Sequence, residues 1–495
     1  MKLTYEGLKN RKSWEEQGFI LPEFDPEIIA RKTAETPEWV HFGAGNIFRA
    51  YLANVAGRAI NAGKLKTGII AVEGYDPEII TKTYRPHDNL SVYLTWSSKK
   101  PVKTVIGSVS DSLLLSDDKL SGIFTAPSLK MVTFTITEKG YAPRTDNNLF
   151  HAVSALLYKR FLTGFPLAMV SADNCSDNGE KLKNCIRIFA EAWEKNGSSK
   201  VGFVKYIDEK ISFPQTMIDK ITPRPNPEFL SLLSDIEDIA PILTAKNTYI
   251  APFVNAEETE YFIVEDNFPN GKLPLEDFGV IYTDKETVKK VEKMKVSALL
   301  NPIHTCLALF GCLLSYTKIS DEMKDPDLLL LVENLSYNEC LPTVSDPVII
   351  NPREFAETVI NVRLKNSSLP DSPQRIASDT SQKLAVRFGE TVKYYLKNGD
   401  VESLKFIPLV YAGFLRYLTA VDDNGNAFEL SPDPLADYLR GSTPEELLSN
   451  ENIFGLDLTK TPLYDKIIAY YKSMCKGKNA VRDTIKGVNN EEILV

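Results

Sequence analysis

The sequence predicts an α/β protein in which a doubly wound parallel-sheet domain, residues 1–284, precedes a mainly α-helical domain, residues 285–495. Before residue 285, short β-branched runs alternate with helical patterns, as expected when helices cover both faces of a parallel sheet. Beyond it, apolar residues recur at helical spacing almost throughout. A length of 495 residues also favours more than one domain.

The first predicted strand ends in a glycine-rich turn that opens a helix. The segment 39–50, WVHFGAGNIFRA, places Gly43 and Gly45 between a buried strand and a helical pattern. In a Rossmann unit, one glycine allows the tight turn and the next lets the backbone approach a pyrophosphate at the helix N-terminus. A partial motif of this kind is weak by itself, because chance glycine pairs are common. We expect Gly43, Gly45, Asn46 and Ile47 to contact a dinucleotide.

The second predicted strand, residues 67–73, ends in an acid, Glu73. An acid at this place binds the two ribose hydroxyls of NAD and repels the 2′-phosphate of NADP. The alternative is an ordinary solvated acid at the end of a strand. We interpret Glu73 as a cofactor residue, which predicts NAD as the cofactor.

Two further strands are predicted to end at the same edge of the sheet. Residues 129–137 form a β-branched run that leads into a turn at Thr137 and Glu138, where a nicotinamide would lie. Residues 167–173 form another strand, and Asn174 follows it in a polar loop. Ligands bind in the crevice at the carboxyl ends of such strands, so Asn174 is placed to face one. Strand-like runs within residues 246–266 are expected to extend this sheet.

Three polar residues interrupt the long apolar run that begins the helical domain. Asn301 and His304 are three positions apart, so a helix places them on one face, and Lys295 precedes Asn301 by about one and a half turns. Burying such groups is costly unless each has a partner. A lysine with a neutral amine can take a proton from a hydroxyl while an amide and an imidazole hold the oxygen, as in a metal-free alcohol dehydrogenase. The alternative is a core helix with a hydrogen-bonded histidine.

Composition limits the partners, the cellular location and the metal content that we expect. The chain has 57 basic and 66 acidic residues, a balance of −9 that argues against nucleic acid or an anionic membrane as partner. The N-terminal residues lack the apolar core of a secretion signal, and the six cysteines form no C-x-x-C pair, which suits a cytoplasmic protein. Only four histidines occur, none in a ligand pair, so no metal is expected. We interpret the apolar residues 296–314 as a core helix and not a membrane span.

Seven segments, in order along the chain, resemble the polyol-specific long-chain dehydrogenases, the family that contains mannitol 2-dehydrogenase, fructuronate reductase and tagaturonate reductase. These segments are residues 41–50, 137–141, 171–179, 217–223, 263–268, 295–304 and 375–383. None is decisive alone, but together they span most of the chain. The resemblance implies a metal-independent, NAD-dependent oxidoreductase acting on a secondary alcohol of an open-chain sugar derivative, nearest in kind to fructuronate reductase.

The resemblance also implies roles for individual side chains. Lys295 resembles the general base that deprotonates the substrate hydroxyl. Asn174 and Asn301 resemble the pair that stabilises the alkoxide. His304 resembles a substrate-orienting group. Polar contacts to the substrate chain are implied for Asp219, Arg375 and Lys383.

One departure from the family concerns the spacing of the lysine. The family usually places four residues between the lysine and the asparagine, whereas five separate Lys295 from Asn301. On a regular helix the extra residue turns Lys295 by about 100°. Either a single π-turn absorbs it, as is frequent at functional sites, or another lysine, such as Lys293, is the base. We favour Lys295, because residues 294–296 keep the family's local pattern.

The expected substrate is a small sugar acid or polyol. Arg375 and Lys383 could pair with the carboxylate of D-mannonate with D-fructuronate or of altronate with tagaturonate, and of these we favour D-mannonate and D-fructuronate. Altronate with tagaturonate and mannitol with fructose are the alternatives, since the same cations occur in polyol members of the resemblance. A different class of function is a nucleotide-binding regulator that has lost catalysis, favoured only by the shifted lysine. The sequence leaves monomer and dimer open.

Overall fold

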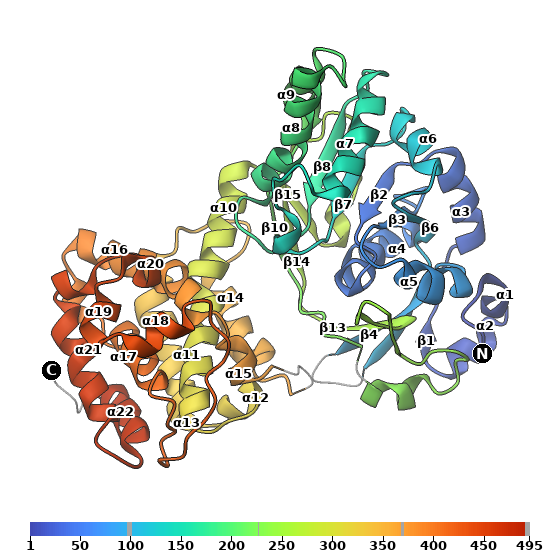
Figure 1. Ribbon diagram of the computed structural model, residues 1–495. Helices are drawn as coiled ribbons and strands as arrows, with labels where there is room; N and C mark the ends of the chain where they lie inside the picture. The colour runs from blue at the N-terminus through green and yellow to red at the C-terminus, as the bar shows by residue number, and fades with distance from the viewer. Residues whose placement is uncertain (97–100, 226, 368–370, 491–495) are drawn as a thin grey trace. The chain divides into compact units, whose positions relative to one another are not determined.

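The computed structural model describes residues 1–96, 101–225, 227–367 and 371–490. Two compact units divide the chain, Met1–Lys289 and Lys290–Val495, with the boundary inside helix α10 (Lys285–Met294). The first unit combines strands and helices, and the second is helical, so the predicted fold class is confirmed (Figure 1).

A parallel sheet of six strands forms the centre of the first unit. Its strands lie in the order β6-β3-β2-β7-β8-β9, and all neighbours pair in parallel. Numbered along the chain, this is the order 3-2-1-4-5-6 of a Rossmann fold, whose ligands bind where the order reverses, between β2 and β7. The strands are β2 (Trp39–Phe42), β3 (Ile69–Glu73), β6 (Val109–Leu114), β7 (Met131–Phe134), β8 (Leu167–Ser171) and β9 (Ile211–Ser212).

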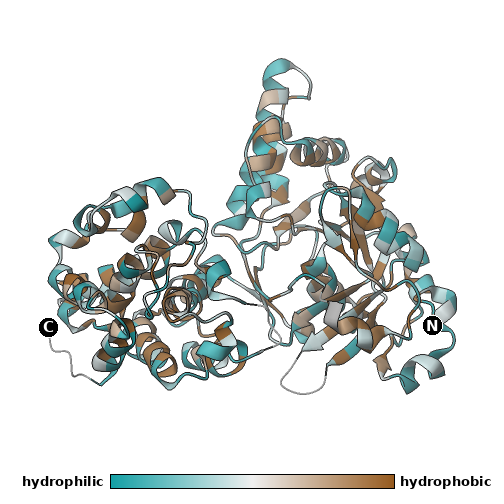
Figure 2. Cartoon of the chain, turned by 60° about the horizontal axis from the view of Figure 1, so that its bottom comes forward, coloured by the Kyte–Doolittle hydropathy of each residue, from teal (hydrophilic) through white to brown (hydrophobic). Residues whose placement is uncertain are grey.

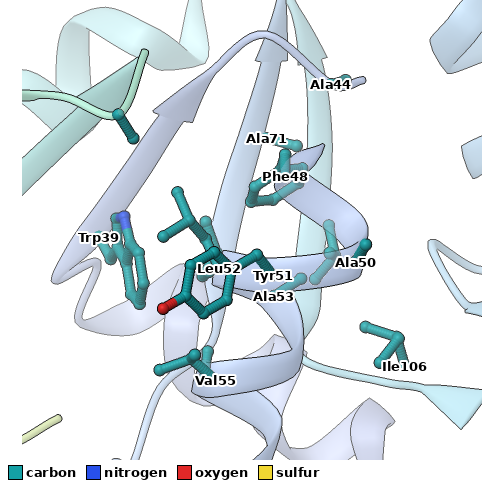
Figure 3. Packing of buried hydrophobic residues seen from close by; sticks show 14 of the residues in the cluster. Trp39, Ala44, Phe48, Ala50, Tyr51, Leu52, Ala53, Val55, Ala71 and Ile106 are labelled. Atoms are coloured by element: carbon teal, nitrogen blue, oxygen red, sulfur yellow. The ribbon is translucent and has the colours of Figure 1, made fainter. Parts of the chain in front are cut away.

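Each face of this sheet packs against its own set of helices. Along β2, Trp39 belongs to one apolar cluster, while Val40 and Phe42 belong to the other, because successive side chains of a strand point to opposite faces. Figure 3 shows the first face, where Tyr51, from the helix after the glycine turn, lies beside Trp39, and Phe48 of the same helix lies near Ala71. Both faces are buried, so β2 and β3 are mainly apolar, as the largely brown central strands in Figure 2 show, with His41 and Glu73 as buried exceptions.

The remaining strands form three smaller sheets, so the expectation that residues 246–266 extend the central sheet is wrong. Strand β12 (Tyr249–Ile250) pairs with β11 (Ile242–Leu243), and β14 (Tyr261–Glu265) lies between β10 (Thr216–Asp219) and β15 (Val280–Thr283). The strands themselves are where their apolar residues predict. Their partners are set by long-range pairing, which the local pattern does not encode. The last sheet has the order β1-β5-β4-β13, formed by β1 (Phe19–Ile20), β4 (Ser91–Trp96), β5 (Val102–Ile106) and β13 (Phe253–Glu257).

Some helices of the first unit begin at a side chain that caps them. Asp25 accepts from the first turn of α3, and Asn147 does the same for α7, as their residue types favour. The helices are α1 (Tyr5–Leu8), α2 (Arg11–Glu16), α3 (Pro26–Glu35), α4 (Asn54–Asn61), α5 (Pro77–Ile79), α6 (Lys119–Thr125), α7 (Asn148–Phe161), α8 (Asn178–Asn196) and α9 (Phe203–Lys210). Two π-helical turns, Phe48–Ala53 and Ile80–Tyr84, adjoin α4 and α5.

The second unit packs its helices around two apolar ones, α11 (Asn301–Leu313) and α17 (Phe406–Tyr417), whose residues are almost all buried. The others are α12 (Ile319–Glu322), α13 (Pro326–Asn334), α14 (Pro352–Thr358), α15 (Pro373–Ile376), α16 (Glu390–Asn398), α18 (Ala436–Gly441), α19 (Pro444–Leu448), α20 (Glu451–Phe454), α21 (Leu463–Met474) and α22 (Ala480–Asn489). Four π-helical turns join them: Lys295–Leu299, Leu335–Cys340, Val359–Arg363 and Ala385–Gly389.

One helical stretch among the described residues, Lys285–Leu313, is long and apolar enough to cross a membrane. Its most apolar window is 78% buried inside the molecule. That burial is what a core helix shows, as expected for residues 296–314.

Candidate active site

The two glycines of the turn after β2 have different roles. Gly43 has φ 103°, and a Cβ there would lie 2.1 Å from the Thr135 carbonyl oxygen, so only glycine fits. Gly45 has no heavy atom within 4 Å of the position a Cβ would take. The first glycine is therefore required by the fold, whereas the second leaves open space beside the start of the helix.

His41 stabilises this turn through a hydrogen bond to the Gly43 backbone. Its Nε2 lies 3.0 Å from the Gly43 carbonyl oxygen, which can only accept, so Nε2 carries the proton. Nδ1 then accepts from the Thr133 hydroxyl at 2.7 Å. Burial lowers the pKa of His41 to about 3, so the ring is neutral at physiological pH. His41 positions the backbone of the turn and carries no charge.

Glu73 closes the turn from the neighbouring strand. Its Oε2 accepts from the Ala44 N–H at 3.0 Å, and its Oε1 accepts from Tyr75 at 2.7 Å and Asp76 at 3.2 Å. The carboxylate is buried, not solvated as the alternative supposed. A carboxylate offers about four lone-pair sites, so three backbone donors leave room for another hydrogen bond.

Asn46 and Ile47 begin the helix that follows. The Asn46 side-chain oxygen accepts from the Arg49 guanidinium at 3.1 Å, and Arg49 also donates to the Ala251 carbonyl at 2.7 Å. Ile47 packs against the apolar cluster on this face of the sheet. Arg49 is buried, and its two hydrogen bonds connect Asn46, at the start of the helix, to the backbone of Ala251.

The turn at Thr137 is fixed by Asp173, which sequence reasoning did not single out. The Asp173 carboxylate accepts from the Ile136 and Thr137 N–H groups, each at 2.9 Å, and from the Tyr141 hydroxyl at 2.7 Å. Thr137 has φ 65°, a conformation that β-branched residues rarely adopt, so the turn needs such support. Burial raises the pKa of Asp173. Beside it, Glu138 is exposed and pairs with Lys181 at 2.7 Å.

Asn174 and Asp219 lie at the ends of strands in the first unit. Asn174 is exposed in the loop after β8, and Asp219 is the buried last residue of β10. Both form interactions within the protein. The loop of Asn174 is held by Asn178, whose amide donates to the Asp173 carbonyl at 3.1 Å and the Thr216 hydroxyl at 2.8 Å.

Lys295 begins a π-helical turn, which settles how the extra residue is accommodated. The turn spans Lys295–Leu299, and the Leu300 N–H donates to the Lys295 carbonyl at 3.2 Å, five residues earlier. Lys295 is buried, with 2% of its surface exposed. Lys293, the alternative base, is exposed and pairs with Glu390 at 3.6 Å. The spacing therefore requires no change of lysine.

Asn301 and His304 occupy the first turns of α11, as predicted. Burial, and the nearby cations Arg363, Arg387 and Arg375, lower the pKa of His304 to about 4, against the opposing effect of Asp371. The imidazole is consequently neutral near pH 7. It can both donate and accept a hydrogen bond, as a group that orients hydroxyls must.

Arg375 and Lys383 have partners within the protein. Arg375 forms an ion pair with Asp371, and its side chain is 65% exposed. The Lys383 ammonium donates to the carbonyl oxygens of Ile376, at 3.0 Å, and Ser378. Burial, followed by the charge of Arg387, lowers the pKa of Lys383 to about 8.

Arg387 is a further basic residue at this place, and sequence reasoning missed it. Its Nη1 donates to the Asn301 carbonyl at 3.3 Å and to the Thr305 hydroxyl. Lys383 and Arg387 are four apart, so they share a helix face, which was a signal available in the sequence. Within the described ranges, no group of three or more His, Cys, Asp or Glu side chains could hold a metal.

Comparison with known families covers both units. A model described as the mannitol dehydrogenase Rossmann domain matches residues 37–277, and one described as the mannitol dehydrogenase C-terminal domain matches residues 287–475. The chain belongs to the mannitol dehydrogenase family. The resemblance carried by the seven segments is thereby confirmed.

Individual members of the family are similar over almost the whole chain. The D-mannonate oxidoreductase of Thermotoga maritima is 44% identical, covering 99% of this chain and 100% of its own length. A substrate-free D-sorbitol dehydrogenase structure aligns with a TM-score of 0.81 at 25% identity, over 94% of this chain and 97% of that one. The Pseudomonas fluorescens mannitol 2-dehydrogenase, in a ternary complex with NAD and D-mannitol, aligns with a TM-score of 0.74 at 25% identity, covering 99% and 100%.

Proposed function

We propose that the protein is an NAD-dependent, metal-independent oxidoreductase that interconverts D-mannonate and D-fructuronate. The observation that carries this proposal is the 44% identity, over essentially the full length of both chains, to a D-mannonate oxidoreductase. The mannitol 2-dehydrogenase of similar fold binds NAD and D-mannitol, which supports the cofactor and the type of substrate.

The glycine turn fits a dinucleotide. Gly45 leaves open space at the start of a helix, where backbone N–H groups and the helix dipole favour a pyrophosphate. Glu73 retains a lone pair for a ribose hydroxyl after accepting from three backbone N–H groups. Gly43, Gly45, Asn46, Ile47 and Glu73 would hold NAD, which accepts a hydride when bound. Thr137 and Glu138 are proposed to lie near the nicotinamide.

Lys295 is proposed as the general base. Buried lysines lose their proton more readily than solvated ones, because burial disfavours the charged form. In the oxidative direction its amine would take the proton of the substrate hydroxyl, and in the reductive direction its ammonium would return it. General-base catalysis of this kind typically contributes about 10²–10⁴ in rate.

The remaining roles follow from hydrogen-bonding capacity. The amides of Asn174 and Asn301 are proposed to donate to the alkoxide oxygen, where losing one donor typically costs about 10²–10³ in rate. Neutral His304 is proposed to orient a substrate hydroxyl. Asp219, Arg375 and Lys383 are proposed to contact the rest of the sugar chain.

Altronate with tagaturonate and mannitol with fructose are the alternative substrate pairs. A catalytically inactive nucleotide-binding regulator is less favoured, because its only support was the shifted lysine, and the π-turn at Lys295 accommodates that shift. A cytoplasmic location and a small-molecule partner fit a metabolic oxidoreductase.

A substrate panel tests the proposal. NADH consumption is measured with D-fructuronate, D-tagaturonate, D-fructose and fructose 6-phosphate, with NADPH as the paired cofactor control. We expect the largest kcat/KM with D-fructuronate and NADH. Turnover confined to fructose would make the protein a polyol dehydrogenase. Binding of NADH without turnover of any compound would favour the regulator.

Glu73 is tested in the same assay. Glu73→Ala is expected to reduce the preference for NADH over NADPH, because it removes the negative charge that repels a 2′-phosphate. An unchanged preference would contradict the cofactor role of Glu73.

A further inference from the structure

The basic side chains around His304 differ in how their charges are balanced. Arg363, Arg375 and Arg387 all act on the His304 ring, and Arg387 and Arg375 act on Lys383. The Asp371 carboxylate opposes these cations at the histidine, and it already pairs with Arg375. The carboxylates of Asp379 and Asp433 oppose the cations at Lys383. The second unit therefore gathers more positive than negative charge around His304.

Arg387 stands apart from the other three cations. Arg375 has a carboxylate partner, Lys383 has two carbonyl partners, and Arg363 has its own interactions. Among the described residues, Arg387 has no ion pair with an acid, and its side chain makes hydrogen bonds only through Nη1. Burial lowers its pKa to about 10, with no opposing acid, although the group remains charged near pH 7. The Arg387 side chain is part-buried, and a cation held partly out of water without an anion is stabilised when a ligand supplies one.

The free edge of this guanidinium is the one that suits a carboxylate. Nη1 is held by the Asn301 carbonyl and the Thr305 hydroxyl, which leaves Nε and Nη2. These two nitrogens form one side of the planar group, with the parallel N–H bonds that bind both oxygens of a carboxylate. Among the described residues, Nε and Nη2 of Arg387 are not buried unsatisfied donors, so a ligand can reach them.

The backbone around Arg387 fixes the position of that edge. Arg387 lies on the π-helical turn Ala385–Gly389, which packs against the π-helical turn Lys295–Leu299 and against α11. Its anchor, Asn301, begins the same helix that carries His304. A carboxylate bound by Nε and Nη2 would consequently sit beside the residues proposed to bind the sugar hydroxyls.

We propose that Arg387 binds the carboxylate of an open-chain sugar acid and thereby separates sugar acids from neutral polyols. This assignment rests on the proposed function and reassigns the anion contact from Arg375 and Lys383, which already have partners. The competing explanation is that Arg387 only clamps the turn Ala385–Gly389 to α11. A clamp would affect acidic and neutral substrates alike.

The test compares an acid with its uncharged amide of the same length. Arg387→Gln keeps hydrogen-bonding capacity but removes the charge and the fork, whereas Arg387→Lys keeps the charge alone. With NAD, kcat and KM are measured for D-mannonate and D-mannitol, and the affinities of the NADH complex for D-mannonate and D-mannonamide are measured by calorimetry. We expect Arg387→Gln to weaken D-mannonate binding by about 10²-fold with little effect on the amide, and Arg387→Lys to restore part of the loss.

Arg416 provides the matched control. It is a buried arginine of α17 whose guanidinium donates to the carbonyls of Met474, Val421 and Asp422. Arg416→Gln should lower the melting temperature and leave the ratio of acid to amide affinity unchanged. If Arg387→Gln weakened the binding of acid and amide equally, so that the ratio of their affinities stayed unchanged, the carboxylate assignment would be overturned while the proposed function stands. If the wild-type enzyme itself preferred D-mannitol to D-mannonate, both the proposed function and the assignment would fail.

Discussion

The two units place their functional groups by different physical means. In the first unit, the candidate cofactor residues are shaped by backbone: Gly43 has a conformation reserved for glycine, and Glu73 and Asp173 spend their carboxylates on backbone N–H groups. In the second unit, Lys295 and Arg387 sit on π-helical turns, and the side chains carry the charge.

This difference follows from what these two sets of residues are proposed to bind, the first a dinucleotide and the second the sugar, to which Asn174 and Asp219 of the first unit also contribute. A dinucleotide presents the same phosphates and ribose to every member of a family, so fixed backbone donors suffice. Sugar acids and polyols differ in one charged group and in hydroxyl configuration, so side chains must distinguish them. π-turns suit that purpose, because each inserts one residue into a helix and redirects the side chain without breaking the helix.

The largest effect on stability is expected when alanine replaces one of the two glycines of the turn. Gly43→Ala places a Cβ 2.1 Å from a backbone oxygen at φ 103°, so it should cost more than about 3 kcal/mol in unfolding free energy or prevent folding. Gly45→Ala meets no atom within 4 Å, so stability should change by less than about 1 kcal/mol.

Urea unfolding and NADH titration separate the two outcomes. Gly45→Ala should weaken NADH binding about 10-fold or more while the protein stays folded, because a methyl group would fill space left for the pyrophosphate. Undiminished NADH affinity in this variant would show that the open space at Gly45 serves no dinucleotide.

A smaller effect is expected at the carboxylate that supports Thr137. Asp173→Ala removes the acceptor of two backbone N–H groups and the Tyr141 hydroxyl, which should cost about 3 kcal/mol. Asp173→Asn keeps one side-chain oxygen and should cost less. The unfolding midpoint of each variant measures this. Equal midpoints for wild type and Asp173→Ala would mean that the turn at Thr137 is held by other contacts.

The smallest effect concerns a buried acid of the helical unit. Glu339 caps α17 by accepting from the Phe406 and Ile407 N–H groups, yet burial raises its pKa from 4.5 to about 7. An acid with a raised folded-state pKa stabilises the fold most when it is protonated. Its contribution is present below pH 4.5 and is lost as pH rises towards 7.

Glu339→Gln removes this titration. Between pH 5 and pH 7, wild-type stability should fall relative to the variant by roughly 2 kcal/mol, measured from urea unfolding at each pH. Parallel stability curves for the two proteins would rule out a raised pKa at Glu339.

Local patterns predicted most of the first unit's framework and the position of Lys295. The glycine turn, the strand ending in Glu73 and the strand before Asn174 are short-range features, since apolar runs and glycines determine them. The extra residue between Lys295 and Asn301 allowed two interpretations, a π-turn that absorbs it or a different lysine as the base. The structure selects the π-turn by burying Lys295 and exposing Lys293.

Long-range features were not predictable in this way. Strand β6 has no strand-like pattern in the sequence, because it lies at the edge of the sheet and contains three consecutive polar residues, Ser110, Asp111 and Ser112. The partners of β12 and β14 depend on tertiary pairing. The spacing of Lys383 and Arg387 indicates a shared helix face, but the contacts of Arg387 with Asn301 and Thr305, 86 and 82 positions earlier, cannot be read from a local pattern.

The most direct test of the proposed division of roles is to measure NADH affinity and turnover together in Lys295→Met. The account predicts that reduction of D-fructuronate falls by about 10³-fold or more, while the dissociation constant for NADH stays within about twofold of wild type. Lys293→Ala, which alters an exposed ion pair, should retain activity. Retained turnover in Lys295→Met, or its loss in Lys293→Ala, would contradict the assignment of the base.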